Sequence, residues 1–432
     1  MTSKTLLSGG CVLTLGAKTP NFTVADVLID GSVVAEVGRG LRARDAVQVD
    51  ATDTIVMPGF VDTHRHAWTS VFRNLGEGAS VAGEPAPAAI SDHFEPEDVY
   101  AATLIGLLGA VEAGITTVVD WSHERSNAGS EAAALQAHAD SGMRTVYATH
   151  DVHPDREATG LTGFAGPLTS IAFGSVLPAD LGSVAGDWAA ARQLGLRIHA
   201  HAGPQSSGNR VIADAAGQGL LGEDVTLVHP SGLDDADVDA IASSGASVSL
   251  APSSEMAGGM GSPPIQQLID ADIRPGLGID TERITPGDMF AQMRATISMQ
   301  HATVFDLKLA GKAGVPHLMG TRDVIRHATV DGARVAGVGR LTGSIEPGMQ
   351  ADVIVLRTDR PNVFPINDPI GAVVWGMDTS NVDWVFVAGR ALMRAGMLQA
   401  DVPRARDLAV AARERMVAAS GLAIGVAPRG DG

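Results

Sequence analysis

The middle of the chain alternates short apolar strands with helical stretches, and this alternation limits the fold more than any other feature. Helical stretches such as 96–113, 131–141, 188–194 and 234–244 separate the strands. Repeated βα units predict a parallel sheet, and eight of them predict a (β/α)8 TIM barrel with its active site at the C-terminal strand ends. The eight candidates are Ile55–His64, Thr116–Asp120, Thr145–Thr149, Ser170–Gly174, Arg197–His201, Thr226–His229, Ser247–Ala251 and Arg274–Asp280.

Both ends of the chain are rich in β-forming residues punctuated by glycine. The shared texture of residues 1–55 and 344–395 predicts one small, discontinuous β-sandwich domain built from both ends. Residues 56–343 would then form the barrel. Residues 396–432 would form a C-terminal helix and tail, with an amphipathic helix over Val402–Ser420.

Composition narrows the class of partner. The 432 residues include 49 acidic and 31 basic side chains, a net charge of −18, which repels nucleic acid and anionic lipid. The single Cys11 excludes a disulfide within the chain and a cysteine-based zinc site. No apolar run of about 18 residues and no signal-peptide pattern occur. We therefore expect a cytoplasmic protein with a small-molecule substrate, no nucleic-acid partner and no membrane partner.

Histidine and aspartate recur at the predicted strand ends. His64 and His66 flank one residue, so their side chains point the same way from a strand. A second His-x-His pair ends at His201, and His229 and Asp280 end two further strands. A lone pair in a chain with 13 histidines can be purely structural. Four strand ends that present these residue types at one rim indicate a metal centre.

The motifs around these residues resemble the amidohydrolase superfamily, in the branch with cytosine deaminase, S-adenosylhomocysteine deaminase and the triazine hydrolases. The matching strings are Pro58-Gly59-Phe60-Val61-Asp62-Thr63-His64-Arg65-His66, Gly114-Ile115-Thr116-Thr117-Val118-Val119-Asp120, and Gly343-Ser344-Ile345-Glu346-Pro347-Gly348 with Ala351-Asp352. The resemblance implies that His64, His66 and His201 are metal ligands. It also implies that Asp280 is both ligand and general base, and that His229 orients the water or polarises the substrate.

Such a ligand set leaves an open position on the metal, where a water molecule can be activated as a nucleophile. Three imidazoles and a carboxylate suit Zn²⁺ and also Fe²⁺. Dinuclear members of the superfamily bridge two metals with a carboxylated lysine, and no lysine lies between residues 19 and 307. We expect one divalent metal, unless a carboxylate bridges two.

One departure from the family pattern bears on the reaction. Deaminases of this branch place a glutamate three residues after the strand-five ligand, whereas Ala202-Gly203-Pro204-Gln205 follow His201. This favours hydrolysis of an amide-, urea- or carbamate-like C–N bond. The alternative is an amino-heterocycle deaminase that uses another acid. A third hypothesis, a non-catalytic barrel scaffold, fits poorly with a complete ligand set.

Several residues near strand ends are candidates for the missing acid or for the substrate pocket. Each could also be a solvated loop charge, a helix cap or ordinary packing. We further expect a homo-oligomer, a dimer or larger. Glu255 and His123 are the candidate acids, and the candidate pocket residues are Trp68, Trp121, Gln205 and Glu282.

Overall fold

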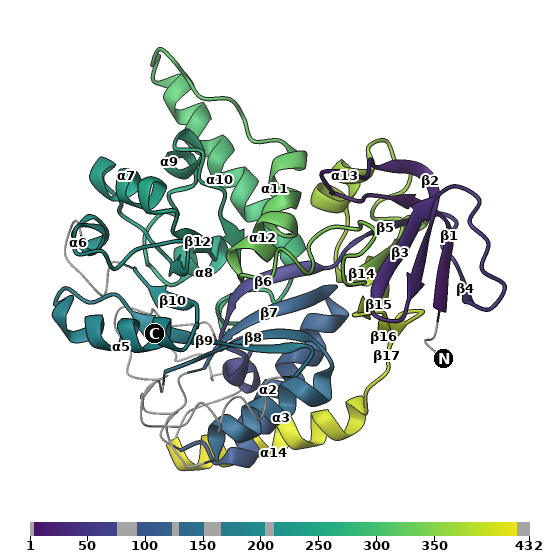
Figure 1. Cartoon of the computed structure of the whole chain (residues 1–432), viewed down its shortest axis with the longest axis horizontal. Coiled ribbons are helices and arrows are strands. Elements are labelled where there is room, and N and C mark those ends of the chain that lie inside the picture. The colour runs from purple at the N-terminus through teal and green to yellow at the C-terminus, as the bar shows by residue number, and fades with distance from the viewer. Residues whose placement is uncertain (1–3, 76–92, 123–128, 151–165, 204–210, 421–432) are drawn as a thin grey trace, which may run out of the picture.

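The computed structural model describes residues 4–75, 93–122, 129–150, 166–203 and 211–420. Its central element is an eight-stranded parallel sheet in the order β13-β12-β11-β10-β9-β8-β7-β6 (Figure 1). His123 and Gln205 lie outside the described residues. The strands are β6 (Phe60–Arg65), β7 (Ile115–Trp121), β8 (Arg144–Thr149), β9 (Thr169–Val176), β10 (Ile198–His201), β11 (Val225–Val228), β12 (Ser247–Leu250) and β13 (Gly276–Leu277).

The first and last strands of this sheet meet at the rim formed by the C-terminal ends of the strands. The carbonyl of His64 accepts a hydrogen bond from the Asp280 amide at 2.8 Å, and the Asp280 carbonyl accepts one from the His66 amide at 2.8 Å. A parallel bridge pairs Arg65 with Asp280. The sheet therefore nearly closes on itself, and the predicted barrel fold is confirmed.

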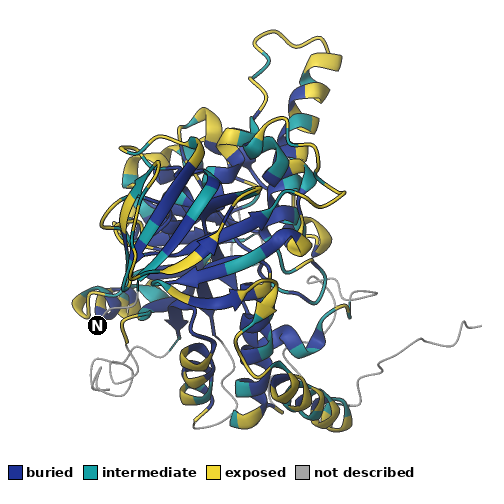
Figure 2. Cartoon of the chain, turned by 90° about the vertical axis from the view of Figure 1, so that its right-hand side faces the viewer, coloured by how far each residue is buried: buried dark blue, intermediate teal, exposed yellow. Residues whose placement is uncertain are grey.

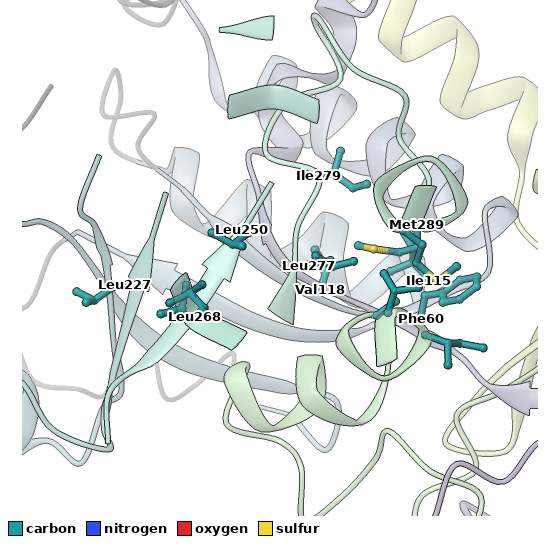
Figure 3. Packing of buried hydrophobic residues seen from close by; sticks show 14 of the residues in the cluster. Phe60, Ile115, Val118, Leu227, Leu250, Leu268, Leu277, Ile279 and Met289 are labelled. Atoms are coloured by element: carbon teal, nitrogen blue, oxygen red, sulfur yellow. The ribbon is translucent and has the colours of Figure 1, made fainter. Parts of the chain in front are cut away.

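Helices surround the barrel (Figure 1). Asp234 begins α7 and Asp288 begins α10, each by accepting a hydrogen bond from the backbone amide three residues on. Figure 3 shows buried apolar side chains such as Leu227, Leu250 and Met289 packed among strands and helices. The helices are α2 (Pro96–Glu112), α3 (Ser130–Ser141), α5 (Gly182–Gln193), α6 (Val211–Gly217), α7 (Asp235–Ser244), α8 (Pro252–Ala257), α9 (Ile265–Asp270), α10 (Met289–Leu309), α11 (Thr321–His327) and α12 (Val330–Val335).

A second sheet joins the two ends of the chain, as the sequence predicted (Figure 1). Strand β5 pairs with β1 in parallel and with β14 antiparallel, which places N-terminal and C-terminal strands side by side. Its buried face carries residues from both ends, including Val27 and Val355. The strands are β1 (Lys4–Val12), β2 (Phe22–Asp30), β3 (Val33–Gly38), β4 (Val47–Asp50), β5 (Thr54–Pro58), β14 (Val353–Arg357), β15 (Val382–Val387), β16 (Arg390–Arg394) and β17 (Met397–Leu398).

The single strand predicted over Ile55–His64 is in fact two strands in two different sheets. Strand β5 belongs to the chain-end sheet, β6 belongs to the barrel, and Gly59 separates them. A Cβ atom at Gly59 would lie 2.1 Å from the Thr116 side chain, so only glycine allows β6 and β7 to approach this closely. We accordingly propose Gly59, rather than residue 55, as the boundary between the two units.

A buried ion pair links the two units. Arg144 of β8 donates from Nε to Oδ2 of Asp352 at 2.6 Å and from Nη2 to Oδ1 at 3.1 Å. The last helix, α14 (Val402–Ser420), has the predicted bounds and packs against α2 (Figure 1). Among the described residues, no helix is both long enough and apolar enough to cross a membrane.

Candidate metal centre

Three histidine side chains converge where β6 and β10 end. The Nε2 atoms of His64 and His201 are 3.0 Å apart. The Nε2 and Nδ1 ligand atoms of His64, His66 and His201 include one set that lies within 4.8 Å of one another. The sequence prediction therefore selected residues that the fold does bring together.

Asp280 lies at the centre of this cluster. Its Oδ1 atom is 3.5 Å from Nε2 of His64, 3.4 Å from Nε2 of His66 and 3.7 Å from Nε2 of His229. Its Oδ2 atom accepts a hydrogen bond from the Ser254 hydroxyl. Both Asp280 (φ 65°) and His229 (φ 56°) adopt the left-handed backbone region that non-glycine residues rarely occupy. Such conformations cluster at functional sites, because the surrounding structure must hold them in place.

Trp121 fixes the orientation of two of the histidines. Its carbonyl accepts a hydrogen bond from Nδ1–H of His66 at 2.7 Å, which leaves the Nε2 lone pair of that ring directed at the cluster. Its indole ring lies 4.0 Å from the ring of His201, centroid to centroid. The indole N–H donates to the His199 carbonyl at 3.2 Å. Trp121, predicted as a pocket residue, is thus part of the wall of the site.

Burial sets the protonation states of the rings. It lowers the pKa of His64 to about 3 and lowers the pKa of His201 well below its usual value, so both imidazoles are neutral. Burial also opposes a charge on His229, but the carboxylates of Asp280 and Glu255 outweigh it and raise the pKa of His229 to about 10. The site combines neutral nitrogen ligands with an ionised Asp280. Burial raises the pKa of Asp280, but His229, His64 and His66 outweigh burial and hold this pKa well below its usual value.

These side chains fit a divalent metal. Two neutral imidazole nitrogens that face each other across 3.0 Å need a shared proton or a cation between them. The histidine and carboxylate donor set is the one that Zn²⁺ and Fe²⁺ accept. His64, His66, His201 and Asp280 would hold the ion, and His229 lies beside Asp280.

Glu255 lies behind His229 rather than in the centre of the cluster. Its Oε1 atom accepts a hydrogen bond from Nδ1 of His229 at 2.8 Å and one from the Ala251 amide at 2.8 Å. The side chain is completely buried at the start of α8. Among the described residues, its Oε2 atom has no hydrogen-bond partner. Glu255 therefore contacts the cluster through the imidazole ring.

Two other predicted pocket residues make their contacts with residues outside the cluster. Glu282 is buried between arginines, with Oε2 at 2.8 Å from Nη2 of Arg73 and 3.3 Å from Nη1 of Arg65. Trp68 packs edge-to-face against Phe94 at 5.4 Å in an apolar cluster. Glu282 is thus held by ion pairs and Trp68 by apolar packing.

Three further residues, which the sequence motifs did not predict as site residues, shape the site. Ser254 holds the outer oxygen of Asp280. Arg65, between two of the histidines, is fully buried and donates from Nε to Asp62 at 2.7 Å. His150 follows β8 and lies against Trp121, with ring centroids 4.1 Å apart. The sequence signal available for Arg65 and Ser254 was their position beside candidate site residues.

Comparison with known proteins identifies the family of the chain. Residues 55–392 match the model of the amidohydrolase family. The chain belongs to the amidohydrolase family. The match spans both the barrel and the return to the chain-end sheet, so it covers every residue of the cluster.

Relatives of this amidohydrolase cover nearly its whole length. It is 27% identical over 430 residues to 5-methylthioadenosine/S-adenosylhomocysteine deaminase 1 of Syntrophus aciditrophicus (strain SB), covering 90% of this chain and 92% of the relative. It is 26% identical over 400 residues to 5'-deoxyadenosine deaminase of Methanothermobacter thermautotrophicus, covering 86% of this chain and 90% of the relative.

Solved structures share its fold. The zinc-bound adenosine deaminase of Xanthomonas campestris superposes with a TM-score of 0.79 at 21% identity, covering 96% of this chain and 99% of that one. An atrazine chlorohydrolase of Arthrobacter aurescens TC1, in complex with zinc and atraton, superposes with a TM-score of 0.79 at 20% identity, covering 94% of this chain and 99% of that one. With the family match, the chain is a hydrolase that acts on carbon–nitrogen bonds.

Proposed function

We propose that this amidohydrolase uses one divalent metal to hydrolyse an amide-, urea- or carbamate-like C–N bond of a small molecule. The observation that carries the proposal is the position of Asp280, whose Oδ1 atom faces the Nε2 atoms of three histidines at 3.4–3.7 Å. The metal would be Zn²⁺ or Fe²⁺, held by His64, His66, His201 and Asp280. When bound, it supplies Lewis acidity that activates water for attack on the substrate carbon.

The residues of the chain supply the proton transfers. Asp280 is ionised and held by Ser254, so it is placed to accept a proton from the attacking water and to donate it to the leaving nitrogen. His229 points its Nε2 atom at the same carboxylate, which places it to polarise the substrate carbonyl or orient the water. Trp121 and His201 form one wall beside these groups.

Deamination of an amino-heterocycle is the second candidate, because the relatives just described are named as deaminases of adenosine-type compounds. It requires a proton donor for the ring nitrogen. Pro204 and Gln205 stand after the strand-five histidine, and Glu255 is bound to His229 and Ala251. His150 follows β8 and lies beside Trp121, so it is a candidate to substitute.

A substrate panel on the metal-loaded enzyme separates the two. Release of ammonia or amine would be followed for ureas, amides and carbamates, and for 5'-deoxyadenosine, methylthioadenosine, adenine, guanine and cytosine, with Asp280→Asn as the inactive control. We expect turnover in the first group. Efficient ammonia release from a purine or pyrimidine, abolished in Asp280→Asn, would replace the proposal with the deaminase. No turnover of any compound by protein that carries metal would revive the scaffold hypothesis.

A further inference from the structure

Helix α10 ends in an arm that projects from the barrel. We define the arm as residues 305–318, the last turn of the helix and the loop after it; no residue in this range is buried. Figure 1 shows it extending beyond the neighbouring helices at the top of the molecule, and Figure 2 shows it largely exposed. Since α10 follows the last barrel strand, it runs back from the catalytic rim, and the arm lies away from the metal cluster.

The arm presents large apolar side chains to solvent. Leu309 is 85% exposed, Phe305 44% and Leu318 45%. Phe305 and Leu309 are four residues apart, so they lie on one face of the helix. Short helical segments in proteins are stabilised mainly by packing of such a face, and apolar patches on a surface mark interaction sites. Phe305 packs against His301, with ring centroids 6.3 Å apart, whereas the described part of the chain leaves most of Leu309 uncovered.

The base of the arm is fixed, so its direction is set before any partner arrives. Gln300 is buried; its side chain accepts a hydrogen bond from the Met319 amide at 2.9 Å and donates one to the His317 carbonyl at 2.9 Å. Nε2 of His301 donates to the Met319 carbonyl at 2.9 Å. A surface held in this way loses little conformational freedom on binding.

The charge of the arm identifies the partner. The arm carries two lysines and one acidic side chain, Asp306, so it is locally basic, whereas the chain as a whole has a net charge of −18. Lys308 and Lys312 are exposed, and they are two of the four lysines in the whole chain. A second copy of the chain supplies the acidic surface that such a segment fits. Helix α9 lies beside the arm's own helix, because Gln300 donates to Gln266 at 2.7 Å. Two exposed carboxylates lie on α9 and just after it: Asp270, which accepts from Gln266 at 2.7 Å, and Asp272, which pairs with Arg274 at 3.7 Å.

We propose that the arm is the contact surface of a homodimer. In a two-fold arrangement the same surface of both copies meets, so each apolar face packs against the other. Lys308 and Lys312 of one copy then face Asp270 and Asp272 of the second copy, and both pairs of contacts occur twice. The proposal concerns assembly and does not depend on the reaction assigned to the metal site.

Sedimentation velocity on the full chain tests it, with circular dichroism as a check on folding. We expect a dimer at micromolar concentration, and we expect Phe305→Glu with Leu309→Glu to raise the dissociation constant at least about 10-fold. The matched control is Met397→Glu in β17, where the side chain is 67% exposed, and it should leave the dimer intact. A monomeric wild type, or arm variants that associate like the wild type, would overturn the proposal.

Charge exchange tests the pairing. Lys308→Asp with Lys312→Asp should weaken the dimer, and adding Asp270→Lys with Asp272→Lys should restore it, with an effect that fades at high salt. A weakened dimer that the second pair of changes does not restore would overturn the assignment to α9. Binding of a monomeric wild type to anionic vesicles, lost in Leu309→Glu, would assign the arm to a membrane instead and contradict the homodimer.

Discussion

Nδ1 of His229 donates a hydrogen bond to Oε1 of Glu255 at 2.8 Å, while Nε2 of the same ring faces Asp280 Oδ1 at 3.7 Å. The imidazole thus lies between two carboxylates, one at the cluster and one buried behind it. The Ala251 amide holds Glu255 in place. This arrangement fixes the orientation of the ring and favours its protonated form, because a carboxylate lies on each side of it.

The first prediction concerns Glu255. Glu255→Gln keeps the size of the side chain but removes the charge that orients His229, so we expect kcat/KM to fall about 10–100-fold while the metal is retained. Activity assays with metal analysis would check this, and Glu223→Gln at an exposed site is the control. Unchanged kcat/KM would contradict a positioning role.

The second prediction separates the two histidines of β10. His201→Ala should lose the metal, because its Nε2 atom lies 3.0 Å from that of His64. His199→Ala should keep most of it: His199 is fully buried, and neither of its ring nitrogens has a hydrogen-bond partner within the described residues. Elemental analysis should find about one metal per chain in wild type. Two tightly bound metals, or the reverse order of loss, would refute the assignment.

The strands and their histidines could be predicted because both signals are local. A buried parallel strand is an apolar run, and a metal ligand at its end is a change of residue type at a fixed position. His64, His201 and Asp280 carry both signals, and in the structure His201 and Asp280 each lie beside His64.

Pairing between distant residues could not be predicted in this way. The segment from Ile55 to His64 is predicted as one strand although Pro58-Gly59 interrupts it, and contacts with β14 and β7 place its two halves in different sheets. Similarly, nothing in the sequence states whether Glu255 faces the cluster or the back of His229. From the sequence, Glu282 cannot be distinguished from an ordinary charged loop residue, because its partners Arg65 and Arg73 are brought beside it only by the fold.

The third prediction concerns the ion pair that links the two units. Asp352→Asn would leave the buried guanidinium of Arg144 without its charged partner, and it would weaken the hydrogen bond from the Ala388 amide. Breaking a buried pair on one side costs about 3–5 kcal/mol, so we expect a large drop in the free energy of unfolding in urea. Asp359→Asn, in an exposed pair with Arg357, should change little. Equal effects of the two substitutions would contradict the prediction.

The last prediction uses the pH dependence of Glu282. Burial alone would raise its pKa, but Arg65 and Arg73 outweigh burial and lower the pKa below the ordinary value of 4.5. A carboxyl group whose pKa is lowered by folding stabilises the native state above its unfolded pKa, and this contribution disappears as the pH falls through the folded value. Glu282→Gln should therefore lower the free energy of unfolding at pH 7, and its difference from wild type should shrink below pH 4.5. Urea unfolding of the wild type and the variant, both metal-free and from pH 7 to acid, would measure this difference in the free energy of unfolding without interference from loss of the metal. A difference that stays constant over the whole range would show that the loss comes from packing, not from the charge that binds Arg65 to the Asp280 loop.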